Sequence, residues 1–381
     1  MYEWALLGLV AAAFYLLECC AWISRPCLAC FRHPLTGGWR AAAAADLIGN
    51  DRGGLLLASP LDFSGAVVQS CEWPFTVNPD GVLSVAVSER DEQDPDYVAF
   101  KDIDTIRPAL ETVLINERVA IKAPSAVAAA EIAALLEQLR SARRRDREKL
   151  IQSTIADRVN LGSIKERWQS FHAETRRLRL ASMIATAWLF VVAPTALLLF
   201  GPLASWLFLL AGLLLCGVVT ATLCFRTHQR LFRAAASDRW THALSMGLFP
   251  LAAFRACDRL SKELMWRFEP IALVAAFCDP RSCAGVIRPI AFDLSRPVAA
   301  AQHADAAACR TWHHDVLRSH VAQMLRAAGG DPLVAPERED TSMAAFCPRC
   351  HTQYSEGRTA CSVCVDVPLE PFVNEAWRSM A

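Results

Sequence analysis

The longest uncharged stretch of this chain constrains its fold more than any other feature, because the 46 residues from Leu180 to Phe225 contain no Asp, Glu, Lys or Arg. About 20 apolar residues let a helix cross the hydrocarbon core of a bilayer, so this stretch is long enough to cross twice. Gly201 and Pro202 lie near its middle and favour a tight turn. We therefore expect a transmembrane helical hairpin over residues 180–225, kinked where Pro194 removes a backbone hydrogen-bond donor.

A second apolar run, Ala5 to Ile23, follows Tyr2 and Trp4, aromatic residue types that favour the membrane interface. A signal peptide would begin with positive charge, whereas this run is preceded by Glu3. We expect an uncleaved transmembrane anchor over residues 1–24, which makes three transmembrane helices in all. These spans explain why the hydrophobic fraction of the chain, 54%, exceeds that of an ordinary soluble domain.

Basic residues predict how these spans are oriented. Arginines follow the first span, precede the second and follow the third: Arg25, Arg32, Arg40, Arg176, Arg177, Arg179, Arg226, Arg230 and Arg233. Because cytoplasmic loops carry an excess of Lys and Arg, we expect the N-terminus outside and the C-terminus in the cytoplasm. The predicted location is a bacterial inner (plasma) membrane, so the first expected partner is the lipid bilayer.

Residues 61–142 alternate apolar and polar side chains, with a turn at Asn78 to Gly81 and a helix that begins after Ser125. The runs "YVAFKDIDTI" and "VLINERVAIKAPS" resemble the bacterial pleckstrin-homology-like (PH-like) fold, which implies a bent β sheet closed by a C-terminal helix. Lipid-headgroup binding in such domains uses basic residues in the first hairpin loop, and this loop has none. A protein-interaction role is therefore the favoured interpretation.

Four cysteines near the C-terminus, Cys347, Cys350, Cys361 and Cys364, form two CxxC pairs ten residues apart. This spacing is typical of a zinc ribbon, in which four thiolates hold Zn²⁺ tetrahedrally and leave no open position. The run "FCPRCHTQYSEGRTACSVC" resembles rubredoxin-like ribbons, although His351 and Val365 occupy positions where such ribbons often have glycine. We expect a structural Zn²⁺ site in a reducing compartment, because disulfides would compete for these thiols.

Two other groups of metal-ligating residue types stay open as hypotheses. Cys27 and Cys30 form a further CxxC directly after the first predicted span. Cys309, His313 and His320 fall near one side of a predicted helix. Both groups fit ordinary packing better than metal or redox chemistry. Cys27 and Cys30 have no second pair of ligands nearby in the sequence, and the helix that carries the histidines has an apolar stripe that places them at its polar edge.

Taken together, the chain resembles bacterial inner-membrane proteins with a PH-like cytoplasmic domain and a C-terminal zinc ribbon, and this resemblance implies an architecture and no activity. The expected order is 1–24 anchor, 25–60 juxtamembrane linker, 61–142 PH-like domain, 143–179 amphipathic connecting helix, 180–225 hairpin, 226–328 cytoplasmic helical segment, 329–345 linker and 346–372 zinc ribbon.

The expected function is that of a membrane-anchored adaptor or regulatory protein with a cytoplasmic protein partner. The alternative is a membrane enzyme or a small oligomeric transporter built on the hairpin, for which Glu18 is the intramembrane charge. No catalytic constellation is visible, so an enzyme is the less favoured interpretation, and homo-oligomerisation stays open. The 39 basic and 39 acidic residues balance, so nucleic acid is not an expected partner.

Overall fold

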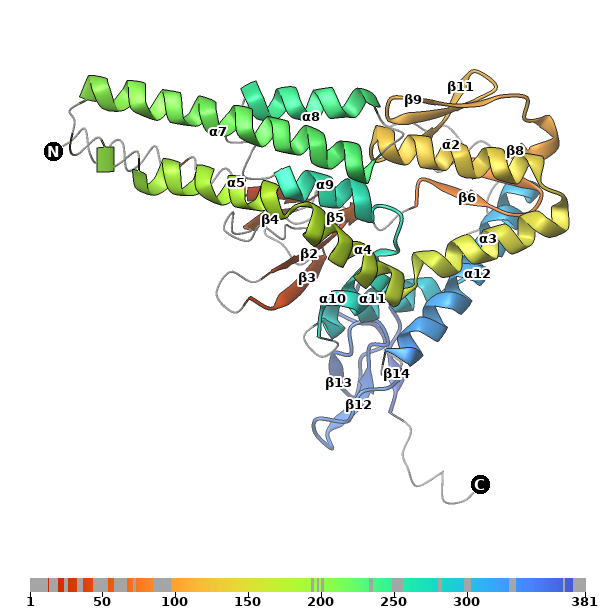
Figure 1. Cartoon of the computed structure of the whole chain (residues 1–381). Helices are drawn as coiled ribbons and strands as arrows, with labels where there is room; N and C mark the ends of the chain where they lie inside the picture. Colours follow the sequence, from red (N-terminus) through yellow and green to blue (C-terminus); the bar gives the residue numbers. More distant parts are fainter. Residues whose placement is uncertain are drawn as a thin grey trace.

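The structure is a computed structural model of the 381-residue chain. It describes residues 13, 20–23, 27–32, 37–43, 54–57, 67–70, 73–84, 97–192, 195–196, 199, 202–232, 236–248, 256–279, 283–297, 303–328, 334–365 and 367–372. Small antiparallel sheets surround a set of helices, two of which extend away from the rest as a long pair (Figure 1).

Strands occupy much of the region expected to be a juxtamembrane linker. Strand β1 (Cys20–Ile23) pairs with β4 (Gly54–Leu57), and β2 (Cys27–Arg32) lies between β3 (Trp39–Ala43) and β5 (Val67–Ser70). The expectation of a linker over 25–60 was wrong, because the short apolar run in β2 is the centre of a sheet and its Leu28, Ala29 and Cys30 are buried. Strand β1 also overlaps the end of the first predicted span, most of which lies outside the described residues.

The next six strands form two separate three-stranded sheets. One contains β6 (Phe75–Val77), β7 (Gly81–Ser84) and β8 (Tyr97–Ala99), which is followed by a short 3₁₀ turn, η3 (Phe100–Asp102). The other contains β9 (Ile106–Ala109), β10 (Thr112–Ile115) and β11 (Arg118–Lys122). All six lie within residues 61–142, where the alternating pattern predicted strands. Strand β9 carries Pro108, which an edge strand tolerates because proline cannot donate to a second neighbour.

Helix α2 (Ala126–Ser141) covers the sheet that contains β9 and β10. Its first turn is capped as expected, since the Ser125 hydroxyl accepts a hydrogen bond from the backbone N–H of Ala128 at 3.1 Å. The strands therefore form two small sheets, and one of them is covered by the helix.

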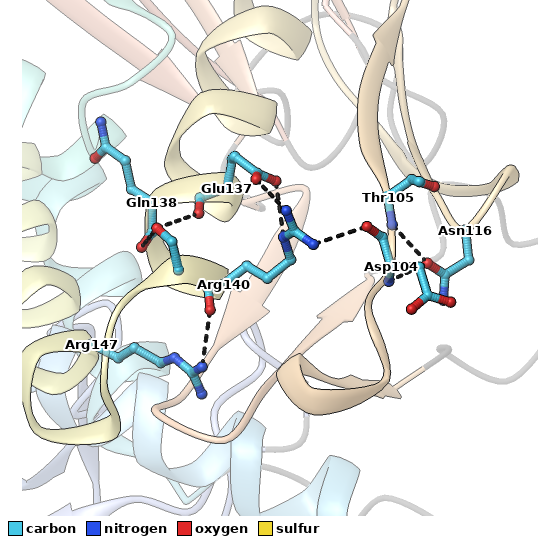
Figure 2. A network of polar contacts seen from close by, with 8 residues as sticks. Asp104, Thr105, Asn116, Glu137, Gln138, Arg140 and Arg147 are labelled. Carbon is cyan, nitrogen blue, oxygen red and sulfur yellow. Dashed lines mark hydrogen bonds and ion pairs between the residues drawn. The ribbon is translucent and has the colours of Figure 1, made fainter.

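A polar network fastens the end of α2 to its surroundings (Figure 2). Arg140 pairs with Glu137 one turn earlier and donates to the carbonyl oxygen of Asp104 at 2.9 Å. The side-chain oxygen of Asn116 accepts from the backbone N–H groups of Asp104 and Thr105, at 2.8 and 3.2 Å. Asn116 and the residue after it have positive φ, which is the geometry of a tight hairpin turn between β10 and β11.

Residues 143–179 form three helices in place of the single connecting helix expected. They are α3 (Arg144–Arg158), α4 (Leu161–Glu174) and the start of α5 (Arg176–Ala187). Asn160 begins α4 as an N-cap, because its side-chain oxygen accepts from the N–H groups of Gly162 and Ser163 at 2.9 and 3.1 Å. The chain therefore turns at Asn160 and again at Thr175, and each helix buries its apolar residues against a different neighbour.

The long pair of Figure 1 is formed by α5, the π-helical turn η4 (Trp188–Val192) and α7 (Pro202–Leu231). Helix α8 (Ala236–Leu248) packs along α7. Pro194, where a kink was expected, lies outside the described residues; the π-helical turn η4 ends two residues before it, at Val192.

One helix within the described part of the chain is long and apolar enough to cross a membrane, at Leu210–Leu231, with a mean hydropathy of 1.7. Three such helices are therefore not supported by the described residues. Among the residues that the structure describes, the large apolar side chains that remain exposed lie on α5, η4, α7 and α8 or between η4 and α7, with four exceptions: Leu110, Val334, Val363 and Val365.

The remaining helices are α9 (Ala256–Met265), α10 (Pro270–Phe277), α11 (Ala284–Ser295) and α12 (Ala304–Ala327). They complete one continuous apolar core with β2, β6, β7, α2, α3 and α4. Three short strands follow, β12 (Met343–Phe346), β13 (Gln353–Ser355) and β14 (Glu370–Pro371), with β12 in the centre. The four cysteines of the predicted ribbon lie in the loops between these strands, two between β12 and β13 and two between β13 and β14.

Candidate metal centre

The four cysteines with ribbon spacing lie together in the structure. The sulfur atoms of Cys347, Cys350, Cys361 and Cys364 all lie within 4.8 Å of one another, and those of Cys350 and Cys361 are 3.6 Å apart. Cys347 and Cys361 are buried, while the other two are half-buried. Four thiols at such separations can hold a metal ion.

Each CxxC pair folds as a tight turn that directs both sulfurs to the same point. In the first turn the N–H of His351 donates to the carbonyl oxygen of Cys347 at 2.8 Å. In the second, the N–H of Cys364 donates to the sulfur of Cys361 at 3.2 Å. His351 and Val365 directly follow these turns and have φ values of 62° and 54°, in the left-handed region that favours glycine. The two departures from the ribbon pattern are therefore positions of backbone strain.

The protein environment already favours a thiolate at one ligand. Although burial raises the pKa of Cys361, the Tyr354 hydroxyl 3.2 Å away and two backbone N–H groups lower it to about 6. Burial raises the pKa of Cys347 to about 11. Because metal ions bind thiolates and not thiols, a bound cation would have to displace the proton of Cys347, and Cys361 is the ligand prepared to bind first.

The ribbon packs on the rest of the molecule through α11, at the lower edge of Figure 1. Phe292 of α11 packs against the small core of the ribbon, which contains Tyr354 and Val367. Beside it, Arg349 pairs with Asp293 at 2.8 Å. The metal centre therefore lies against a helix of the main body, although its own core is too small to fold without a metal or a neighbour.

The other two candidate groups do not form metal sites among the described residues. Cys30 lies buried in β2. On α12, Cys309 faces the carbonyl oxygen of Gly81 at 3.9 Å, and the Nδ1 atom of His313 lies 3.1 Å from the carbonyl oxygen of Val77. Burial, followed by the charge of Arg158, lowers the pKa of His313 to about 3, so its imidazole is neutral. These residues pack α12 against β6 and β7.

A second group of ligating side chains, which sequence reasoning missed, consists of His228, His242 and Glu263. They come from α7, α8 and α9, so no local spacing in the sequence connects them. Comparison of the chain with family models, curated proteins and solved structures found no match. Function therefore has to be argued from these sites and from the apolar helices.

Proposed function

We propose that this chain is a membrane-anchored adaptor or regulatory protein that presents folded cytoplasmic modules, one of which is a zinc ribbon. The observation that carries the proposal is the gathering of exposed apolar side chains on α5, η4, α7 and α8. Soluble monomeric proteins rarely expose so large a contiguous apolar surface, whereas lipid would cover it. The proposed arrangement is a hairpin over 180–225, with the apolar residues that precede β1 as a further span.

Close packing between the two arms supports a hairpin. Gly212 of α7 lies directly against the indole ring of Trp188 in η4, where a side-chain carbon would overlap that ring. Trp188 also packs on Phe208 of α7, with ring centroids 4.7 Å apart. Small residues at such positions let membrane helices approach closely, because helix association in lipid depends on van der Waals contact. Arginines at the other ends of both arms favour a cytoplasmic body.

Zn²⁺ is the metal proposed for the four cysteines. Four thiolates on two tight turns suit a tetrahedral ion that prefers sulfur, and they occupy every position of its coordination shell. A saturated site has no place for a substrate or a reactive water. The proposed role of the ion is therefore to hold the ribbon in the shape that packs on α11.

The two sheets over β6 to β11, followed by α2, support a PH-like module that binds protein in preference to lipid headgroups. Its first hairpin loop is closed by Asn78, whose side-chain oxygen accepts from the N–H groups of Asp80 and Gly81 at 3.0 and 2.8 Å. The acidic side chain in that loop pairs with Arg144 at 2.8 Å. No lysine or arginine of the loop itself is available for a phosphate group.

Reporter fusions test the proposed topology in a bacterial host. A reporter that is active only in the cytoplasm should function when fused after residue 381, and one that is active only outside should function when inserted between Gly201 and Pro202. The opposite pattern at either site would refute the proposed orientation.

Partner capture tests the adaptor role. The full chain is cross-linked in cells and compared with Cys361→Ser, which removes a ligand, and with the matched control Cys216→Ser, which removes a thiol outside the ribbon. We expect the same cross-linked protein with the parent and with Cys216→Ser, and its loss with Cys361→Ser. The absence of any cross-linked protein with the parent chain would contradict the adaptor role, and an identical pattern in all three chains would show that the ribbon does not contribute to partner capture.

A further inference from the structure

We propose that His228, His242 and Glu263 form a second metal site, which binds a divalent transition-metal ion such as Zn²⁺ or Fe²⁺ and ties the apolar helix α7 to α8 and α9. The ligand atoms of the three side chains all lie within 4.8 Å of one another. Each residue comes from a different helix, so an ion at this point would hold all three helices together. The inference is independent of the adaptor role and of the ribbon.

The geometry centres on the carboxylate of Glu263. One of its oxygens lies 2.5 Å from Nε2 of His242, and the other lies 3.3 Å from Nε2 of His228. The two imidazole rings face the same carboxylate, with their centroids 5.4 Å apart. Two imidazole nitrogens and a carboxylate oxygen are therefore already gathered around one position.

Hydrogen bonding within the protein leaves this group unsatisfied. The side chain of His228 is 0% exposed, yet neither of its ring nitrogens makes a hydrogen bond of good geometry. The Glu263 oxygen that faces it also has none. A buried polar group without a partner is costly, and such groups in native proteins usually signal a water, an ion or a function. The hydrogen bond between His242 and Glu263 accounts for the polar atoms of two of the three residues. It leaves the ring nitrogens of His228 without a hydrogen bond of good geometry.

The donor set indicates the class of ion. Imidazole nitrogens suit zinc, iron, nickel and copper, whereas magnesium and calcium prefer a shell made of oxygens. Two histidines and one carboxylate recur in both zinc and non-haem iron(II) sites, where positions remain for water or another ligand. His242 is the ligand that solvent reaches, since 19% of its side chain is exposed, and it therefore marks the side from which an ion would enter.

Neighbouring aromatic side chains stiffen the two histidine ligands. Phe232 packs on the ring of His228 with centroids 4.9 Å apart, and Phe225 packs on Trp240 at the same separation. Trp240 precedes His242 on α8, so this contact fixes the start of α8 against α7. Ligands held on rigid helices lose little freedom when an ion binds.

The test uses the full chain, purified in detergent micelles and loaded with Co²⁺ in place of the native ion. We expect two equivalents of bound metal by mass spectrometry. Cys361→Ser should retain one, and its absorption spectrum should lack the sulfur-to-cobalt charge-transfer band of a four-cysteine site. Adding His242→Gln to Cys361→Ser should remove the remaining equivalent, whereas adding the matched change His303→Gln, at an exposed histidine, should leave it.

Glu263→Gln gives an independent arm, because glutamine can still hydrogen-bond His242 but is a poor metal ligand. Melting in metal-free buffer shows whether each variant is folded. One equivalent of cobalt in the parent chain together with the sulfur-to-cobalt band, or a second equivalent that survives in folded His242→Gln or Glu263→Gln, would overturn the inference. Failure of the ribbon to bind metal would appear separately, as the absence of the charge-transfer band.

Discussion

Replacing Glu269 with glutamine should strongly destabilise the protein, because Glu269 forms a buried ion pair with Arg158. Their side chains are 8% and 4% exposed. Arg158 ends α3 and also accepts a backbone hydrogen bond from Glu269 at 3.0 Å, so the pair joins α3 to the start of α10. Burial lowers the pKa of Arg158 to about 9, which still leaves its guanidinium charged at neutral pH.

The magnitude follows from what remains around the guanidinium once the carboxylate is gone. Losing one partner of a buried ion pair costs about 3–5 kcal/mol, since the other charge stays buried. The guanidinium lies 3.4 Å from the ring centroid of Trp73, and this cation–π contact, worth about 2 kcal/mol when desolvated, survives the change. We therefore expect Glu269→Gln to lower the free energy of unfolding by about 3 kcal/mol. Arg158→Met isolates a buried carboxylate with no such contact and should cost nearer to about 5 kcal/mol.

Thermal melting in detergent, followed by tryptophan fluorescence, measures the effect. A loss of about 3 kcal/mol corresponds to a fall in Tm of roughly 4 °C in a chain of 381 residues, because the entropy of unfolding grows with chain length. The double change Arg158→Met and Glu269→Met should melt close to the parent, because apolar replacements of a buried pair are often neutral. The reasoning is refuted if Glu269→Gln melts within about 1 °C of the parent, or if the double variant melts as low as Arg158→Met.

Three further predictions concern strain, acid and helix packing. Val365→Gly should stabilise the ribbon by about 1 kcal/mol and slow metal loss to a chelator, because it removes a β-branched residue from positive φ; Val363→Gly, which relieves no such strain, should not. Burial lowers the pKa of His313 from 6.5 to about 3. Between these two pH values the unfolded chain binds a proton at this residue and the folded chain does not, so stability falls as the pH drops below 6.5. Between pH 6.5 and 5 the free energy of unfolding should fall by about 2 kcal/mol. The Tm should fall with it, and it should fall less in His313→Met. An equal fall in Tm in both proteins would contradict this prediction. Gly212→Val should lower the Tm by overlapping Trp188 while leaving the metal content unchanged, and an unaltered Tm would show that the two arms do not pack closely.

The local sequence pattern was enough to predict those features of the structure that depend only on neighbouring residues. The cap at Ser125 was predicted from the sequence, and so was the turn at Asn78 to Gly81. The meeting of the four cysteines was also predicted, because each CxxC turn places two sulfurs together by itself. Prediction failed for β2, where a short apolar run was interpreted as a linker, and for the connecting helix, where Asn160 starts a new helix. In both cases tertiary contacts decided between conformations that the local sequence allows.

By itself, then, the sequence determined that 46 consecutive residues carry no charge and that two CxxC pairs provide four thiols, because both properties belong to residues close together in the chain. Only the tertiary structure decided that Arg158 meets Glu269 and that His228, His242 and Glu263 converge. The physical reason is that these groups lie on separate elements. Their charges and ligand atoms come together only when the helices that carry them pack around a common core.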